Sequence, residues 1–392
     1  MKRVHLAEGA VPLTIQLPTD VAAALCKFEV ATTTPAGAGE WIVSNIRKVG
    51  VVRVGDYQID IRPKVSIPRL FFLMGFSAER DFWKRHDVTI DLDDELLNTV
   101  AEAFIRQTGK AIGQGLLQGY ETIDESLHIF RGRLDVAAQV GRRGGLVLPA
   151  QVVFDEFTID IAENKMLLGA AQRLLRMPSL ARKHRTVLKK LTQSLDGVST
   201  LPHGIGLPTV HFTRLNARYR DAVILAQLIL RNTSLEQRPG EIVATAFLFD
   251  MWQIFEDFVT TALGDSLREI GGSVEAQVKG ECLDIGGNIN LRPDLIWKDG
   301  ARVNAVIDAK YKAPKNSTYP NADIYQMLAY CVRFALRTGH LIYAKGEEEP
   351  HVHEIIGHNA SIQCHAVDLD QDPASLLQQM GRIALKIHEC VE

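Results

Sequence analysis

The acidic residues Asp294 and Asp308 lie in two segments that both read as β-strands, and their spacing restricts how this chain can fold. Asp299-Gly300 between the segments is a turn signal. Side chains alternate along a strand, so a two-residue hairpin at that turn would pair Asp294 with Ala305 and place the two carboxylates on opposite faces. Carboxylates arranged in this way could not bind one cation together.

An irregular connection between the two segments removes this conflict. A longer loop over roughly residues 298–304, or a β-bulge, brings Asp294 opposite Asp308. Pro293 cannot donate a hydrogen bond to a sheet, which favours an irregular or edge position just before Asp294. We therefore predict a distorted connection in place of an ideal hairpin.

The residues around Asp294 and Asp308 match the needs of metal-dependent phosphodiester chemistry. Two carboxylates can hold a hard divalent cation such as Mg²⁺, which polarises a phosphate and helps to form hydroxide from water. Lys310 shares a strand face with Asp308, and it can orient or deprotonate that water. Ala309 points the other way, so only its backbone carbonyl can join the metal shell. An acidic residue two positions before a lysine is a weak signal by itself, because it is common by chance.

A predicted helix over residues 247–259 carries Glu256 at the edge of its apolar stripe. A carboxylate in that position is unfavourable unless something pairs with it. A metal ion, a water bound to the metal, or Lys310 would be a suitable partner. An ordinary surface salt bridge explains Glu256 equally well, so both interpretations stay open.

A second predicted helix, over residues 323–337, carries a stripe of hydrogen-bond donors opposite its apolar face. Helical spacing places Gln326, Tyr330, Arg333 and Arg337 along this stripe. Such a surface suits a phosphate backbone or the waters around a metal, although a solvated face is the more usual origin of polar stripes. We take Arg333 and Arg337 as candidate DNA contacts, and the flanking candidates are Arg292 and Lys312.

Charge and composition narrow the classes of protein to consider. The net charge of −3 is low for a protein that holds DNA alone, because phosphate contacts dominate DNA affinity. Positive charge is concentrated between Arg131 and Lys190, where the sequence has twelve Lys or Arg and only five Asp or Glu. This segment could contact DNA or an acidic partner. Five dispersed cysteines argue against disulfides and zinc, and no apolar run suggests a membrane span or a secretory signal, so we expect a cytoplasmic protein.

Two other motifs do not support a further site. Thr108-Gly109-Lys110 lacks the glycine and the preceding strand that a P-loop requires, so we expect no nucleotide site in this chain. His351 and His353 share a strand face at a spacing that could bind a metal, but histidines are common on surface strands.

The pattern of apolar residues, turns and breakers predicts a mixed α/β chain. Residues 1–88 are expected to be strand-rich, with a hairpin around Gly55-Asp56, and Pro239-Gly240 marks the best domain boundary. Further helices are predicted over residues 96–117, 164–176, 179–195 and 214–230 and from Pro373 onward. Further strands are predicted over residues 129–136, 146–154, 340–344, 352–356 and 362–369.

The order Glu256, Asp294, Asp308-x-Lys310 and Gln326-x-x-x-Tyr330 resembles the PD-(D/E)XK nuclease superfamily, in the branch with a Gln-x-x-x-Tyr helix. The amino-acid sequence around these residues resembles the McrC family still more closely. The members of this family are the nuclease subunits of McrBC-type modification-dependent (type IV) restriction systems. The likeness spans most of the chain. Its matching stretches are residues 54–64, 130–135, 154–157, 216–219, 247–259, 292–295, 307–311 and 323–330.

This resemblance implies a fold, a site and partners. The fold would be a strand-rich and helical partner-docking region over residues 1–235, followed by a nuclease domain over residues 236–392 with a mixed sheet flanked by helices. Asp294, Asp308 and the Ala309 carbonyl would bind Mg²⁺. Lys310 would assist the attacking water, and Glu256 would be a metal or outer-shell ligand. Gln326 and Tyr330 would position DNA or metal-bound water.

The resemblance also implies a complex. A McrB-like AAA+ GTPase hexamer would bind GTP and recognise double-stranded DNA with modified cytosine, while this chain would stimulate the GTPase and cut. Two alternatives remain open: a standalone RecB-like nuclease of repair or recombination, and a non-catalytic activator of an AAA+ ring. The first would cut without the GTPase. The intact Asp294, Asp308 and Lys310 argue against the second.

Overall fold

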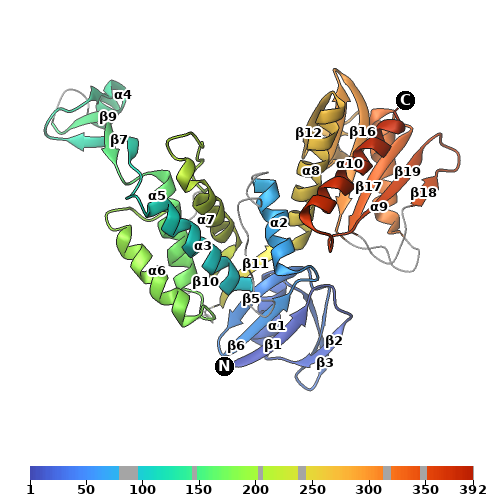
Figure 1. Cartoon of the computed structure of the whole chain (residues 1–392), viewed down its shortest axis with the longest axis horizontal. Coiled ribbons are helices and arrows are strands. Elements are labelled where there is room, and N and C mark those ends of the chain that lie inside the picture. Colours follow the sequence, from blue (N-terminus) through green and yellow to red (C-terminus); the bar gives the residue numbers. More distant parts are fainter. Residues whose placement is uncertain are drawn as a thin grey trace. The chain divides into compact units, whose positions relative to one another are not determined.

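The chain is a mixed α/β protein, as predicted. A computed structural model describes residues 1–78, 96–143, 148–201, 206–236, 244–311, 319–344 and 351–391 (Figure 1). Its contacts form two compact units, one made of Met1–Leu92 with Leu248–Glu392 and the other of Asp93–Phe247. None of the described helices combines the length and the apolar character needed to span a membrane.

The first unit begins with two small sheets. The predicted hairpin around Gly55-Asp56 is confirmed: β5 and β6 pair antiparallel, with Val54 opposite Tyr57, and β1 lies parallel to β6. The N-terminal strands of this sheet are β1 (Lys2–Ala7), β5 (Lys48–Val54) and β6 (Tyr57–Arg62), and they belong to a five-stranded sheet with the order β1-β6-β5-β11-β10. The second sheet and the helix between its strands are β2 (Leu13–Gln16), α1 (Thr19–Lys27), β3 (Thr32–Gly37) and β4 (Glu40–Ser44).

A six-stranded mixed sheet forms the C-terminal part of this unit, in the order β12-β15-β16-β17-β19-β18. β16 is antiparallel to β15 and parallel to β17, so it joins the two halves of the sheet. The strands are β12 (Ser273–Ala276), β15 (Leu295–Asp299), β16 (Arg302–Lys310), β17 (Thr338–Ala344), β18 (His351–Glu354) and β19 (Ser361–Val367). A separate two-stranded ribbon is formed by β13 (Glu281–Cys282) and β14 (Asn290–Leu291).

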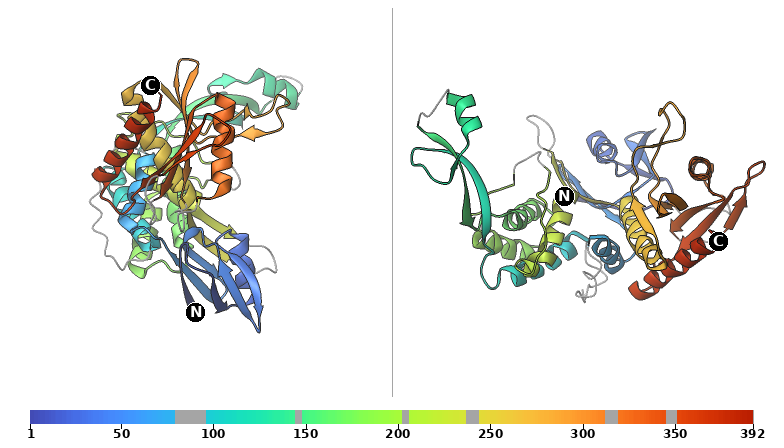
Figure 2. Two further views of the ribbon diagram at one scale, coloured as in Figure 1. Left: turned by 90° about the vertical axis from the view of Figure 1, so that its right-hand side faces the viewer. Right: turned by 90° about the horizontal axis from the view of Figure 1, so that it is seen from above.

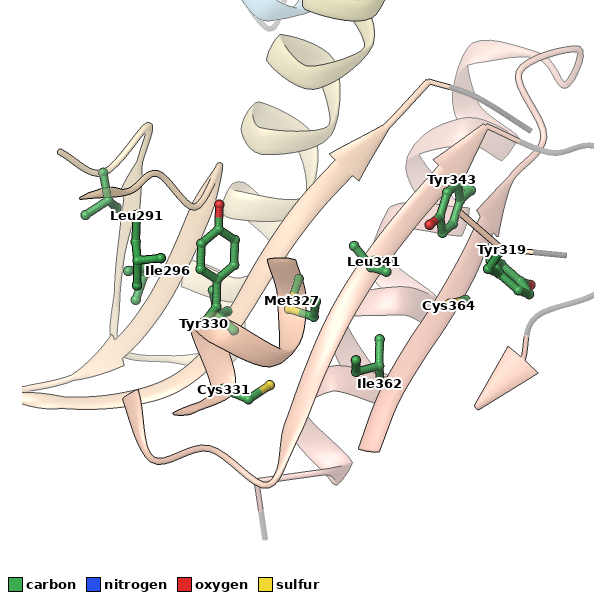
Figure 3. Packing of buried hydrophobic residues seen from close by; sticks show 12 residues of the cluster. Leu291, Ile296, Tyr319, Met327, Tyr330, Cys331, Leu341, Tyr343, Ile362 and Cys364 are labelled. Atoms are coloured by element: carbon green, nitrogen blue, oxygen red, sulfur yellow. The ribbon is translucent and has the colours of Figure 1, made fainter. Parts of the chain in front are cut away.

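Helices cover both faces of this sheet (Figure 2). α9 (Asn321–Phe334) packs on the face that carries Ile296, Val306 and Leu341, where the buried cluster includes Met327 and Tyr330 (Figure 3). α8 (Met251–Ile270) and α10 (Pro373–Glu389) pack together on the other face.

The helix that was predicted from residue 247 begins later, at Met251. Asp250 is its N-cap, and its carboxylate accepts the Trp252 N–H at 3.1 Å. Residues 247–250, which were predicted as the first turn of this helix, instead belong to the strand β11 (Ala244–Asp250).

The helix α2 (Ile67–Ala78) shows why the chain divides differently from the predicted domains 1–235 and 236–392. The rings of Phe72 and Phe76 lie 5.6 and 5.7 Å from the ring of Phe258 in α8. These buried aromatic contacts join the N-terminal strands to the C-terminal sheet in one compact unit. A division at residue 235 would cut through that core.

The second unit is a helical body that carries a long hairpin. The hairpin strands β7 and β9 pair antiparallel, with Gly119 opposite Thr158 at one end of the ladder and Leu127 opposite Ala150 at the other. The elements are α3 (Leu96–Ile112), β7 (Gly119–Leu127), β8 (Arg133–Leu134), α4 (Val136–Arg143), β9 (Ala150–Thr158), α5 (Ala162–Leu175), α6 (Arg182–Ser194), a 3₁₀ turn (Ala217–Tyr219), α7 (Arg220–Asn232) and β10 (Thr233–Glu236). Of the strand predicted over residues 129–136, only the two residues of β8 are a strand in the structure. The domain boundary was predicted around residues 233–240, and the first four of these residues form β10.

Candidate active site

The turn between β15 and β16 lies one residue later than predicted. Asp299 pairs with Arg302, so Gly300 and Ala301 form the two-residue turn. Gly300 has a φ of 58°, in the left-handed region that glycine adopts without a steric penalty.

A β-bulge then shifts the register of the two strands. The pairs on either side of the bulge are Trp297 with Ala305 and Lys298 with Val303, which leaves Asn304 without an opposite residue. The last pair of the ladder is Leu295 with Ile307. The next position along this register places Asp294 opposite Asp308, on the same face of the sheet. The predicted distortion is therefore confirmed.

Asp308 and Lys310 form an ion pair at the end of β16. Asp308 is 2% exposed, and its Oδ2 lies 2.5 Å from the Lys310 ammonium. Lys310 also donates to Gln326 Oε1 at 2.9 Å, and Gln326 Nε2 donates to the Tyr330 hydroxyl at 2.7 Å. The strand end and α9 are thus linked by one continuous chain of polar contacts.

Asp294 is held by the backbone of β16. Its Oδ2 accepts the Ala309 N–H at 2.7 Å. In a sheet the N–H and C=O of one residue point to the same neighbouring strand. The Ala309 carbonyl is therefore directed toward the Asp294 side, as a role in a shared cation shell requires.

Glu256 reaches the same carboxylates from α8. It is 7% exposed and hydrogen-bonded to Asp294. Burial raises the pKa of Glu256, and the neighbouring Asp257 and Asp308 raise it further. The interpretation of Glu256 as part of an ordinary surface salt bridge is therefore wrong. The side chain of this residue is buried beside the site.

The carboxylates of the site repel one another. Burial and the charge of Glu256 raise the pKa of Asp294 to about 7. Burial and the charge of Asp294 raise the pKa of Asp308 to about 7. Negative charge is therefore concentrated here without full compensation, which is the condition that a bound cation would relieve.

Lys310 is held in its protonated form. Burial alone would lower its pKa, but the attraction of Asp308, together with Asp323 and Asp294, outweighs burial and raises it. A lysine in this state is a hydrogen-bond donor and a positive charge. It is not poised to take a proton from water.

The oxygen donors of the site fit Mg²⁺ better than a softer metal. Mg²⁺ is commonly bound by one or two carboxylates and keeps several waters, and Asp294, Asp308 and the Ala309 carbonyl supply such ligands. Within the described ranges, no three His, Cys, Asp or Glu side chains form a preassembled metal centre. Glu256, which is hydrogen-bonded to Asp294, lies beside these ligands.

The donor stripe predicted on α9 is not a continuous exposed surface. Tyr330 is 1% exposed and lies in the core between α9 and the sheet (Figure 3). Arg333 pairs with Glu281 at 2.8 Å. The helix predicted over residues 323–337 ends at Phe334, so Arg337 lies beyond α9. Arg337 is exposed and lines a cavity of about 730 Å³ together with Arg302 and Arg333. Of the flanking candidates, Arg292 is exposed and Lys312 lies outside the described residues.

Sequence reasoning missed Asp323 near the site. Asp323, in the first turn of α9, attracts Lys310 and accepts the Tyr343 hydroxyl at 3.1 Å. An acidic residue in a first helical turn was the available signal, but it is typical of helices in general.

The structure also locates the remaining sequence motifs. Thr108-Gly109-Lys110 lies inside α3, so it forms no phosphate-binding loop. All five cysteines are free. The rings of His351 and His353 lie 4.6 Å apart, yet no third metal-binding side chain joins them among the described residues.

Comparison with known proteins places these features in context. The model of the McrBC 5-methylcytosine restriction system component family matches residues 44–344. Among solved structures, the chain resembles one in a half-complex of the tetradecameric assembly of Thermococcus gammatolerans McrB AAA+ hexamers with bound McrC. That match has 16% identity and a TM-score of 0.60, and it covers 98% of this chain and 100% of that chain. A chain of the Thermococcus gammatolerans McrBC complex matches with 20% identity and a TM-score of 0.39, over 68% and 88% of the two chains. No curated protein matches.

Proposed function

The chain belongs to the McrBC family of 5-methylcytosine restriction system components, and from this premise we propose that it is the Mg²⁺-dependent DNA endonuclease subunit of such a system. It cleaves phosphodiester bonds through a PD-(D/E)XK-type site. The observation that carries the proposal is the convergence of three side chains. Asp294, Asp308 and Lys310 meet at one end of β15 and β16, where the bulge at Asn304 aligns them.

The residues of the site divide the catalytic work. Asp294, Asp308 and the Ala309 carbonyl would hold Mg²⁺, which when bound would supply the polarisation of the scissile phosphate and the activation of water. Lys310, protonated and partly buried beside Asp308, stabilises the negative charge that develops on the phosphate.

Gln326 and Tyr330 keep Lys310 in place. The Tyr330 ring is buried in the core between α9 and the sheet. Its hydroxyl accepts a hydrogen bond from Gln326, and Gln326 accepts one from Lys310. A rigid hydrogen-bonded support of this kind limits the positions that the ammonium can take. Glu256 acts from outside the metal shell through its hydrogen bond to Asp294.

We further propose that the partner is a McrB-like AAA+ GTPase hexamer. A solved structure that covers 98% of this chain is named for McrB AAA+ hexamers with bound McrC. The described part of this chain carries no P-loop, so GTP would bind to the partner. The low net charge is consistent with DNA binding, including recognition of modified cytosine, by another subunit.

The hairpin of the second unit is the surface that best suits partner docking. Large apolar side chains are exposed there, and exposed apolar patches mark interaction sites. They are Tyr120, Ile129, Phe130, Val136, Val140, Leu148 and Phe157. Part of the basic segment Arg131–Lys190 lies on the same hairpin, so charge and apolar area occur together.

Cleavage by the reconstituted complex tests the proposed function. The chain is mixed with a McrB-like GTPase, GTP, Mg²⁺ and DNA that carries 5-methylcytosine, and products are separated on a gel. Asp308→Asn is expected to reduce cleavage at least about 10³-fold, as the loss of a metal ligand should, while stimulation of GTP hydrolysis persists. Asp299→Asn is the matched control, because Asp299 is exposed on the same hairpin.

The same experiment separates the alternatives. Cleavage without the GTPase or GTP would identify a standalone nuclease. Stimulated GTP hydrolysis without any cleavage would identify a non-catalytic activator. Cleavage by Asp308→Asn at the wild-type rate would overturn the assigned site.

A further inference from the structure

Glu8 is a buried carboxylate at the end of the first strand. It is 4% exposed, and its N–H donates to the Arg62 carbonyl at 2.9 Å. Its Oε2 accepts the Lys64 N–H at 3.0 Å. The Glu8 backbone is therefore fixed by the last residue of β6, and its side chain by the segment that follows β6.

Tyr311 connects this carboxylate to the candidate active site. It directly follows Lys310, and its hydroxyl donates a hydrogen bond to Glu8. Its ring lies 5.7 Å from the ring of Phe255, the residue before Glu256. One side chain thus contacts the end of β16, the helix α8 and the end of β1.

The hydrogen bond between Tyr311 and Glu8 depends on the tyrosine hydroxyl and on the buried carboxylate. A buried carboxylate needs donors, and a hydrogen bond to a charged acceptor is stronger than one between neutral groups. The Tyr311 hydroxyl and the Lys64 N–H supply two such donors to Glu8. If the hydroxyl is removed, Tyr311 loses the anchor that fixes its direction at the end of the strand.

We propose that Glu8 and Tyr311 are positioning residues that hold the end of β16, and with it Lys310, in the geometry needed for cleavage. The N-terminal strands then complete the nuclease unit from a distance of about three hundred residues in sequence. This inference rests on the proposed nuclease function. Neither residue contacts the reacting atoms, and each acts through Lys310.

The test uses the full chain in the reconstituted complex. Tyr311→Phe keeps the ring against Phe255 and removes the hydroxyl. It is expected to lower kcat about tenfold while KM for DNA changes less than twofold, since small displacements of catalytic groups slow the chemical step. Glu8→Gln keeps an oxygen acceptor for the hydroxyl and is expected to stay within threefold of wild type. Tyr325→Phe, at an exposed tyrosine of α9, is the matched control and should not change kcat.

A double-mutant cycle with Glu8→Ala shows whether the pair acts as a unit. Glu8→Ala combined with Tyr311→Phe should be no slower than the slower single variant. Multiplicative losses would show two independent structural effects and would overturn the proposal. So would a wild-type kcat for folded Tyr311→Phe.

Hydrogen exchange separates this inference from the proposed function. In Tyr311→Phe, the peptide that covers residues 305–311 should exchange at least about fivefold faster, while peptides of α10 stay unchanged. If wild-type protein does not cleave DNA, the proposed function fails, but the exchange result still decides whether Glu8 and Tyr311 fix β16. Unchanged exchange in both Tyr311→Phe and Glu8→Ala would overturn the positioning role.

Discussion

Asp294 stands opposite Asp308 because Asn304 bulges out of β16, and the turn that joins the two strands contains only two residues. The register shift comes in two parts. The turn lies at Gly300-Ala301 in place of Asp299-Gly300, and the bulge adds one more residue. Both are needed to bring the two carboxylates to the same face. Local irregularity in the strand thus creates the candidate metal site.

The crowding of carboxylates predicts a pH-dependent gain in stability for Asp294→Asn without metal. The pKa of Asp294 is about 7 in the fold and about 4 in the unfolded chain. The folded state thus holds protons that the unfolded state releases, so stability falls as pH rises from 4 to 7. Asparagine keeps an oxygen for the Ala309 N–H and removes the charge. At pH 8 the variant should be more stable by about 1–3 kcal/mol.

Urea unfolding in EDTA at pH 5 and pH 8 measures this difference. The gain should shrink toward pH 5, where wild-type Asp294 is largely protonated. Asp299→Asn, on the exposed part of the same hairpin, should change stability by less than about 0.5 kcal/mol at either pH. A loss of stability in Asp294→Asn at pH 8 would contradict the repulsion inferred here.

Gln326→Ala should slow cleavage through Lys310. The substitution removes the acceptor at 2.9 Å from the Lys310 ammonium and the donor at 2.7 Å from the Tyr330 hydroxyl. We expect kcat to fall about tenfold with KM for DNA nearly constant. Steady-state cleavage kinetics measure the effect. Tyr325→Ala, one residue away and 66% exposed, should have no comparable effect on kcat, and equal losses in both variants would assign the effect to α9 as a whole.

Gly339→Ala should destabilise the C-terminal sheet. An added Cβ at this buried glycine would lie 2.6 Å from Met327 Sδ and 2.7 Å from Cys331 Sγ, on the face of α9 that meets β17. Overpacking of this kind costs about 1–3 kcal/mol. Gly381→Ala in α10 meets no atom within 4 Å and should instead stabilise the protein by about 0.5–1 kcal/mol. Thermal and urea unfolding of both variants check these opposite signs, and equal shifts would contradict the packing argument.

Arg337→Ala should weaken DNA binding by the complex at low salt. Arg337 is exposed at the cavity that Arg302 also lines, whereas Arg333 is paired with Glu281. Loss of one phosphate contact should reduce the slope of log affinity against log salt by about 1. Filter binding or fluorescence anisotropy over a salt series measures the slope. Arg382→Ala, on the exposed face of α10, is the control, and an unchanged slope for Arg337→Ala would exclude a phosphate contact.

Much of the candidate site could be predicted from the sequence because its chemistry is local. Asp308 and Lys310 share a face through the two-residue period of a strand, and Gln326 and Tyr330 share a face through the helical period. The need for a distorted hairpin followed from the same period. The bulge itself was one of two solutions, and residue types alone did not decide between a bulge and a long loop.

The features that could not be predicted depend on contacts between distant segments. No local pattern shows that Phe72 and Phe76 pack on Phe258, so the domain boundary was misplaced. The link between Glu8 and Tyr311 has the same origin. Helical spacing suggested an exposed stripe on α9, but the sheet buries Tyr330 and Glu281 neutralises Arg333. Spacing gives the direction of a side chain and says nothing about what lies in front of it.

The division of the first unit into two distant stretches of sequence has a consequence for synthesis. Residues 1–92 leave the ribosome long before residues 248–392, and the whole second unit is made in between. At about 5–20 residues per second this interval lasts roughly 8–30 s. The early strands must wait for their partners in residues 248–392. A nascent chain therefore gains its assembled candidate site only in the final stage of translation.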